Sequence, residues 1–201
     1  LGGNVRSSTK VVKIERDASG VVVRTADGKA ERFDHVVVAT HADEALALLG
    51  DASDKERRLL GAFGYSHNRA FLHTDAGLMP RRRGVWSSWN YIENGGTYVT
   101  YWMNRLQPLP ASPQLFVTLN PPRSPEPGSI LKVANYTHPI FDAGAIEAQK
   151  HLWSLQGDRN TWYCGAYFGS GFHEDGLQAG LGPCVTGVGQ GLQDVVAVLQ
   201  G

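Results

Sequence analysis

The chain has 201 residues, 42% of them hydrophobic and 19% charged, which is enough for one large domain with a globular core. The 19 Lys and Arg residues balance the 19 Asp and Glu residues, so the charge gives no indication of a nucleic acid or an anionic membrane as partner. Two cysteines are too few for a disulfide scaffold, and this composition favours a reducing, cytoplasmic setting.

The first part of the chain, residues 5–39, is predicted to form β structure. Apolar runs at 11–14 and 21–23 are separated by turn-forming residues, and Asp27-Gly28 is a strong hairpin signal. Residues 36–39, Val-Val-Val-Ala, form a continuous β-branched run, which is typical of a strand buried on both faces of a sheet.

A helix is predicted over residues 42–49, which have apolar side chains at helical spacing. Thr40 is the candidate N-cap of this helix, and Gly50 should end it. The charged stretch 51–60 that follows indicates a short helix or a linker, and we place a domain boundary after residue 52.

Between residues 63 and 136, short strand-like segments alternate with turns rich in Gly and Pro, a pattern that suggests an antiparallel sheet. The predicted strands are 69–73, 85–91, 98–103, 115–119 and 130–133. The cluster of arginines at 81–83 is short and is read as a solvated loop. Aromatic residues fall on both strand parities, so one face should be core and the other should line a cavity or lie under another domain.

A second helix is predicted over residues 141–155, with Asp142 as a plausible N-cap. The chain then enters an apolar run, Trp162-Tyr163-Cys164, that reads as a buried strand. A glycine-rich turn and an acidic helix start follow, and this arrangement lets backbone N–H groups approach a ligand closely. A plain turn is the alternative interpretation of the same residues.

The last part of the chain is predicted to lose this helix at Gly182-Pro183. Gly187, Gly189 and Gly191 should loosen the segment that follows, and residues 192–199 offer a short helical pattern.

The segment WYCGAYFGSGFHEDGLQAG, residues 162–180, resembles the flavin-contacting segment of FAD-dependent oxidoreductases related to flavin-containing amine oxidases. The stretches YVTYWMNRLQ and FVTLNPP and the pair His138-Pro139 resemble the subgroup associated with cyclopropane-fatty-acid synthases. The resemblance covers residues 1–181, and it implies a mixed α/β fold, or α+β fold, with FAD as cofactor. It assigns residues 1–52 and 139–201 to a partial FAD-binding domain and residues 53–138 to an inserted antiparallel substrate domain.

The resemblance also implies site residues. The expected cofactor-binding residues are Val11, Val12, Ala39, Gly165, Ala166, Glu174, Asp175 and Gly176. Among these, the amides of Asp175 and Gly176 are expected to face the pyrimidine edge of the ring. Candidates for the substrate pocket are Trp89, Tyr101, Trp102 and His138. No catalytic residue is assigned, and no metal site is predicted, because the histidines lack the spacing of a zinc helix.

No G-x-G-x-x-G motif follows a strand near the start of the chain. The family keeps this phosphate-binding unit in an N-terminal part, so the chain is interpreted as the C-terminal portion of an oxidase, inactive by itself. The expected substrate is a small molecule, either an amine or, preferably, a modified fatty acyl chain or acyl lipid, and homo-oligomers are compatible with the sequence. The alternative is a non-catalytic module that binds an apolar ligand or partner through its aromatic sheet.

Overall fold

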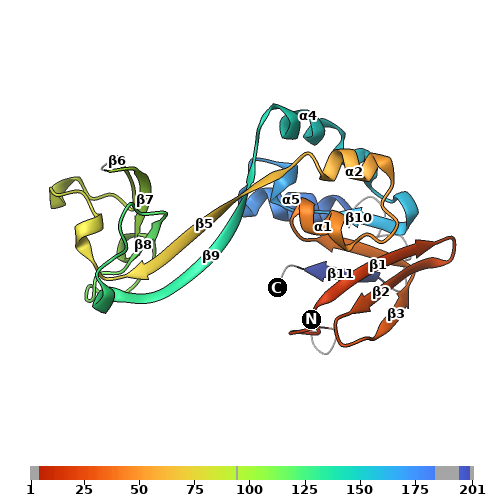
Figure 1. Ribbon diagram of the computed structural model, residues 1–201, viewed down its shortest axis with the longest axis horizontal. Coiled ribbons are helices and arrows are strands. Elements are labelled where there is room, and N and C mark those ends of the chain that lie inside the picture. Colours follow the sequence, from red (N-terminus) through yellow and green to blue (C-terminus); the bar gives the residue numbers. More distant parts are fainter. Residues whose placement is uncertain (1–4, 94, 184–194, 200–201) are drawn as a thin grey trace. The chain divides into compact units, whose positions relative to one another are not determined.

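The computed structural model of the chain describes residues 5–93, 95–183 and 195–199 (Figure 1). The chain divides into two compact units: the first combines Leu1–Tyr65 with Pro139–Gly201, and the second is Ser66–His138. This mixed α/β architecture with an inserted sheet confirms the predicted fold class. The first division of the chain falls after Tyr65, later than the predicted boundary, because the helix at 54–60 packs in the first unit.

The first unit contains two small sheets. One is antiparallel, with the order β1 (Val11–Asp17), β2 (Gly20–Thr25) and β3 (Ala30–Phe33). The other is parallel, with the order β10 (Thr161–Tyr163), β4 (His35–Ala39) and β11 (Val195–Leu199). Strand β4 is therefore central. Its Val36 and Val38, which share one face, are fully buried, whereas Val37 on the other face is partly exposed, so the predicted burial on both faces is complete on one face only.

Four longer helices belong to this unit: α1 (Ala42–Leu48), α2 (Asp54–Leu60), α4 (Ala143–Leu152) and α5 (His173–Pro183). The predicted N-cap of α4 is confirmed, since the Asp142 carboxylate accepts a hydrogen bond from Ala145 N at 2.9 Å. The predicted N-cap of α1 is wrong: His41 is the N-cap residue, and its N–H is bound by the Glu44 carboxylate. The Thr40 hydroxyl instead donates to His41 O.

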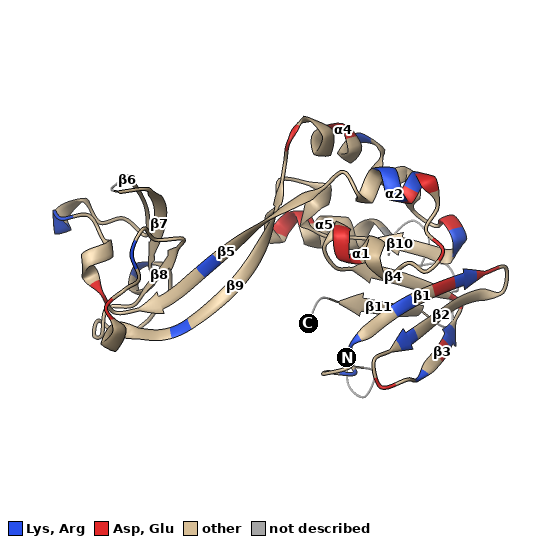
Figure 2. Cartoon of the chain, viewed as in Figure 1, with Lys and Arg blue, Asp and Glu red and all other residues tan. Residues whose placement is uncertain are grey.

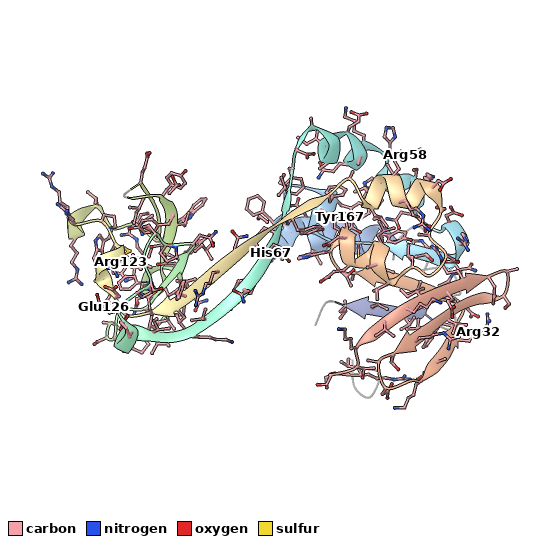
Figure 3. The ribbon with its side chains drawn as sticks, viewed as in Figure 1. Arg32, Arg58, His67, Arg123, Glu126 and Tyr167 are labelled. Atoms are coloured by element: carbon pink, nitrogen blue, oxygen red, sulfur yellow. The ribbon has the colours of Figure 1, made fainter. Side chains whose placement is uncertain are left out.

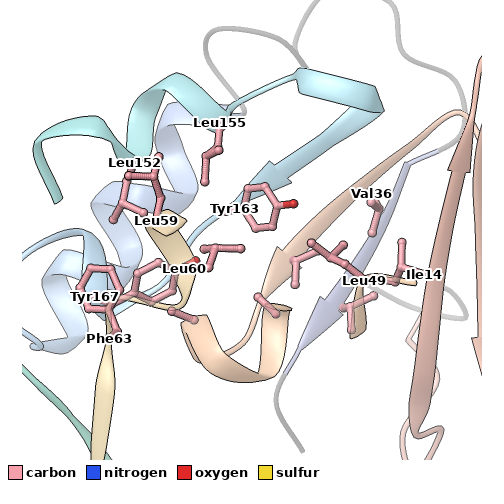
Figure 4. Packing of buried hydrophobic residues seen from close by; sticks show 14 of the residues in the cluster. Ile14, Val36, Leu49, Leu59, Leu60, Phe63, Leu152, Leu155, Tyr163 and Tyr167 are labelled. Atoms are coloured by element: carbon pink, nitrogen blue, oxygen red, sulfur yellow. The ribbon is translucent and has the colours of Figure 1, made fainter. Parts of the chain in front are cut away.

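The hydrophobic core of the first unit joins strand β4, strand β10 and helices α1, α2 and α4 (Figure 4). Tyr163 lies at its centre in Figure 4, between the leucines of α2 and the end of α4. The fully buried members with the largest side chains are Tyr163, Tyr167, Ile14, Leu60, Leu152 and Leu155. Because residues from both ends of the chain share one core, the first unit needs both segments to fold.

The C-terminal segment differs from the prediction. Residues 195–199 form strand β11, which pairs in parallel with β4, whereas the apolar spacing predicted a helix. Val195, Val196 and Val198 are β-branched and fit the open edge of β4 better than a helix. Helix α5 ends at Pro183, where the sequence places a break, and Gly187, Gly189 and Gly191 lie outside the described residues.

The second unit is built on a five-stranded sheet in the order β6-β7-β8-β5-β9. Its elements are β5 (Gly64–His73), β6 (Trp89–Glu93), β7 (Thr97–Trp102), α3 (Met103–Leu106), β8 (Phe116–Leu119) and β9 (Ile130–Ile140). Strand β6 begins at Trp89, later than predicted, because a 3₁₀ helix, Arg83–Val85, occupies the preceding residues. Two more 3₁₀ helices of the second unit are Ala76–Leu78 and Pro127–Ser129. Those described in the first unit are Trp153–Leu155, Asp158–Asn160 and Ala166–Phe168. Among the described helices, none is long and apolar enough to cross a membrane.

The covered face of this sheet carries a buried chain of hydrogen bonds that starts at His73. His73 Nδ1 accepts from Asp75 N at 3.1 Å, so the ring proton is on Nε2, which lies 2.8 Å from Thr118 Oγ1. Thr118 Oγ1 in turn lies 2.8 Å from Thr100 Oγ1, and the Thr100 hydroxyl donates to Leu78 O. The chain therefore runs from His73 Nε2 to the Leu78 carbonyl, which accepts at its end. His73 must be neutral because Nδ1 can accept from Asp75 N only without a proton of its own.

Burial lowers the pKa of His73; the nearby Asp75 carboxylate opposes this effect and Arg123 adds to it. Arg123 and Glu126, labelled in Figure 3, both contact Asp75, Arg123 through its guanidinium and Glu126 through its N–H.

We expect the second unit to lose stability in mild acid. The folded unit binds fewer protons than the unfolded chain, so stability is complete above the unfolded pKa of about 6.5 and declines below it, by up to about 1.4 kcal/mol per pH unit. Hydrogen exchange of the β7 and β8 amides at about pH 8 and about pH 5.5 measures this decline. A His73→Gln variant with an equal decline would contradict the assignment to His73.

Candidate functional site

The carboxyl ends of the parallel strands β4 and β10 lie side by side in the first unit. Cys164 N donates to Val38 O at 3.1 Å, which continues the pairing of the two strands beyond Tyr163. The next residue, Gly165, comes so close to the end of β4 that an added Cβ would lie 3.2 Å from Thr40 O. The structure therefore brings Ala39 and Gly165, two of the predicted cofactor residues, to one edge of the sheet, where ligands of parallel α/β sheets bind.

Helix α5 begins against the same turn. An added Cβ on Gly176 would lie 3.6 Å from Ala166 N and 3.9 Å from Gly165 C, so the first turn of the helix faces the peptide between Gly165 and Ala166. No side chain separates helix and turn at this point, since the facing residues are Gly176 and a peptide group. Gly165, Ala166, Asp175 and Gly176 are all partly exposed, and the site is lined mainly by backbone.

The Asp175 carboxylate binds within the glycine-rich turn. Its Oδ2 accepts hydrogen bonds from Ser170 N at 3.0 Å and from Phe172 N at 2.8 Å. Gly169 lies against this carboxylate so closely that an added Cβ would meet Asp175 Oδ1. Asp175 therefore fixes the shape of the turn through its side chain.

The amides of Asp175 and Gly176 do not face outward as expected. Both donate to Phe172 O, at 3.1 and 3.3 Å, because Phe172 occupies the N-cap position of α5. The amides without an intrahelical acceptor are those at the very start of the helix, and within the described part of the chain those of His173 and Glu174 have no backbone acceptor. The positive end of the helix dipole is thus presented by His173 and Glu174.

Two further residues hold this turn, and neither was identified from the sequence. The Gln149 side chain on α4 donates to Tyr167 O at 2.9 Å and to Gly169 O at 2.6 Å. Tyr167 is 2% exposed, its ring lies 5.4 Å from that of Phe63, and its hydroxyl has no hydrogen-bond partner among the described residues (Figure 3). Burial raises the pKa of this hydroxyl, so Tyr167 is neutral. The only sequence signal for Gln149 was its place on the inner face of a predicted helix.

Val11 and Val12 lie apart from this turn, on β1 of the antiparallel sheet. Val11 pairs with Thr25 and Lys13 pairs with Arg24, so Val12 is an extra residue without a partner on β2. Such a bulge leaves the peptide groups of Val12 outside the ladder. The residue is 45% exposed.

Three of the four predicted substrate residues share the open face of the sheet in the second unit. Trp89 stacks on Tyr101 across β6 and β7, with ring centroids 6.2 Å apart and planes at 4°. His138 Nδ1 lies 2.9 Å from Asn68 Nδ2 at the start of the sheet. Trp102 is on the other face, where its ring packs against Trp86 and its Nε1 donates to the Gln114 side chain. The prediction of Trp102 as a pocket residue therefore conflicts with its orientation.

Parallel strands that end at a backbone-lined turn and a helix start, with an antiparallel sheet inserted between the two halves, define a cofactor-binding α/β enzyme fold. A family model described as flavin containing amine oxidoreductase matches residues 1–120. The chain belongs to this family of FAD-dependent enzymes, which confirms the resemblance seen in the sequence.

Solved structures with the same fold include a fatty acid isomerase from P. acnes that produces CLA, at a TM-score of 0.57 and 17% identity, covering 89% of this chain and 47% of that one. Cyclohexylamine oxidase from Brevibacterium oxydans IH-35A matches with a TM-score of 0.57 and 12% sequence identity, over 86% of this chain and 46% of the oxidase. Reduced UDP-galactopyranose mutase matches with a TM-score of 0.56 and 12% sequence identity, over 81% of this chain and 42% of the mutase. The chain thus spans less than half of each of these proteins, and none of the curated proteins matches it.

The residues present fit the ring end of FAD. A flat ring system needs a site with little side-chain bulk, and Gly165 and Gly176, which are partly exposed, bring no side chain to the strand ends. The start of α5 adds two free amides and the positive end of a helix dipole, which suit the anionic edge of a reduced ring.

Proposed function

We propose that this chain is the part of an FAD-dependent oxidoreductase that holds the flavin ring and carries the substrate wall. The observation that supports this proposal most is the convergence of Thr40 O, the peptide between Gly165 and Ala166, and Gly176 at one edge of a parallel sheet. Bound FAD would supply the acceptor for a hydride, or its equivalent, from a C–H bond of the substrate. The substrate would lose that hydride and a proton, and two electrons would pass to the flavin.

The chain's own residues would act by position and charge. Ala39, Gly165 and Ala166 would let the ring lie against the strand ends, while Val12, with its free peptide groups, would approach the adenine end. The amides of His173 and Glu174 would stabilise the negative charge that reduction places beside α5. Gln149 and Asp175 would keep the turn in shape, since they bind its carbonyl and N–H groups.

A fatty acyl chain is the preferred substrate. The open face of the sheet in the second unit is apolar and aromatic, with Trp89 and Tyr101 stacked on it. An amine would bind as a cation, and cations in proteins are often held by carboxylates. Among the five strands of this sheet only β6 carries a carboxylate, that of Glu93, although the similar cyclohexylamine oxidase takes an amine by its name. The fatty acid isomerase, which shares the fold, is consistent with an acyl substrate.

The visible spectrum of the full-length protein tests the proposal. We expect flavin absorption in the purified protein, or after reconstitution with FAD, and bleaching of this absorption on anaerobic mixing with a fatty acid. Bleaching by cyclohexylamine instead would transfer the assignment to amines. A colourless protein that cannot be reconstituted would refute the flavoenzyme proposal.

A second candidate function is a non-catalytic module that binds an apolar ligand or partner, including a second copy of the chain. The exposure of Trp89 (63%) and Tyr91 (73%) on the open sheet favours it, because large exposed apolar patches mark interaction surfaces. This module would bind hydrophobic ligands with equal affinity before and after removal of flavin, and it would show no turnover.

A further inference from the structure

A groove lies on the open face of the second unit's sheet, with a volume of about 390 Å³. It is formed by alternate residues of three neighbouring strands and by the segment that follows β7. The lining residues are Ala70, Leu72, Met103, Gln107, Leu109, Leu115, Val117, Lys132, Ala134 and Tyr136. A groove of this size that is mostly aliphatic suits a flexible hydrocarbon chain.

One charged residue, Lys132, lines this groove. No carboxylate lines it, and among the described residues Lys132 makes no ion pair. Figure 2 shows the same imbalance, with a blue segment but no red one along β9, where Lys132 is the only Lys or Arg. An unpaired cation at the edge of an apolar groove is complementary to an amphipathic ligand with one negative end.

Strand β9 sets the direction of such a ligand. Lys132, Ala134 and Tyr136 alternate along the strand and line the groove, and His138 continues the same parity. At about 3.3 Å per residue, the part of β9 that lines the groove, from Lys132 to Tyr136, spans ~13 Å. A ligand that follows the strand from Lys132 is therefore extended.

We propose that this groove binds an unesterified long-chain fatty acid, with its carboxylate on the Lys132 ammonium and its chain along Ala134 and Tyr136. Binding of the fatty acid in this groove does not depend on the proposed function. Only the role of this fatty acid as the substrate rests on the proposed function. A free carboxylate matches a single Lys, whereas esterified lipids carry their charge on a head group that is bulkier than a carboxylate. Each methylene buried in the groove should improve affinity about fourfold.

The test is equilibrium binding of palmitate, octanoate and hexadecanol to the full-length protein, followed by tryptophan fluorescence. We expect palmitate to bind more tightly than octanoate, and more tightly than hexadecanol. Lys132→Met keeps an apolar stem and removes the charge, and it should weaken palmitate binding about three- to fivefold, as expected for a partly exposed ion pair. Its affinity for hexadecanol should stay unchanged.

Arg82→Met is the matched control, because it removes an exposed cation of the same unit outside the groove. It should leave the affinity for palmitate unchanged. Ala134→Phe should fill the groove and weaken palmitate binding at least tenfold, while the melting temperature of the protein shows that the variant is folded.

Equal losses in Lys132→Met and Arg82→Met, equal affinity for palmitate and hexadecanol, or no palmitate binding at all would each overturn the proposal. The flavin spectrum is recorded on the same samples. A colourless protein whose palmitate affinity depends on Lys132 would refute the proposed function and support the groove. A flavoprotein that is bleached by fatty acids but whose palmitate affinity does not depend on Lys132 would support the proposed function and refute the groove.

Discussion

Replacing Arg16 by methionine should destabilise the protein by about 3–5 kcal/mol, because the variant leaves a buried carboxylate without its cation. The Arg16 side chain is fully buried, and that of Glu56 is 2% exposed. Arg16 Nη2 donates to Glu56 Oε2 at 3.0 Å, and the Tyr163 hydroxyl donates to Glu56 Oε1 at 2.6 Å. Ser53 adds a third contact, since its N–H donates to Glu56 at the start of α2. Urea denaturation at neutral pH measures the loss.

The pH dependence of this effect identifies its cause. Burial alone would raise the pKa of Glu56, but hydrogen bonds from Arg16 and Tyr163 lower it to about 2. A carboxyl with a lowered pKa stabilises the fold above its unfolded pKa of about 4.3, and this contribution disappears as the pH falls through the folded value. In Arg16→Met the buried Glu56 carboxyl has a raised pKa and takes up a proton above about pH 4.3, which relieves part of the loss. The difference between wild type and variant should therefore begin to shrink above about pH 4.3 and continue to shrink to about pH 2.

Arg24→Met is the control for this prediction. Arg24 lies on the neighbouring strand β2 and pairs with Glu15, but its side chain is 49% exposed. Its loss should cost at most about 1 kcal/mol. A cost similar to that of Arg16→Met would show that the buried position of Arg16 is not what matters. Partial recovery in the double variant Arg16→Met, Glu56→Leu would support the explanation that an unpaired charge causes the loss.

The sequence predicts local elements well where one residue type decides them. Asp142 caps α4 as expected, because an Asp before an apolar periodic run has one good use for its carboxylate. The apolar spacing of residues 192–199 predicts a short helix, although spacing over so few residues fits both periods. Only the open edge of β4, which depends on the tertiary fold, decides for a strand.

The sequence proposes Gly165, Ala166 and Gly176 as parts of one cofactor site, and the structure brings these three residues together. The free amides at this place belong to His173 and Glu174, since the helix begins after Phe172. The residue at which a helix begins is set by its cap geometry, and here the amides of Asp175 and Gly176 both bind Phe172 O. The buried ion pair between Arg16 and Glu56 is not predicted from the sequence, for a different reason. Arg16 has the parity of the buried Ile14, and this signal becomes informative only when the facing Glu56 is known.

Gly165→Ala should greatly reduce FAD binding, with an affinity at least about tenfold lower and flavin lost during purification. The added Cβ would lie 2.7 Å from Tyr167 Cε1 and 3.2 Å from Thr40 O. Both neighbours are constrained, since the Tyr167 ring is packed on Phe63 and Thr40 follows the central strand. The turn must therefore move away from the strand end, and the surface proposed for the ring changes shape.

Gly180→Ala provides the matched control for Gly165→Ala. It adds the same methyl group on α5, where nothing lies within 4 Å, so it should keep its flavin and gain helix stability. The flavin content per protein measures FAD binding in both variants, and circular dichroism shows whether each variant is folded. If Gly165→Ala folds and retains FAD as well as Gly180→Ala, the ring does not lie at this turn. The backbone convergence at the strand ends would then be a packing feature of the first unit, and the flavin would have to be held by other residues.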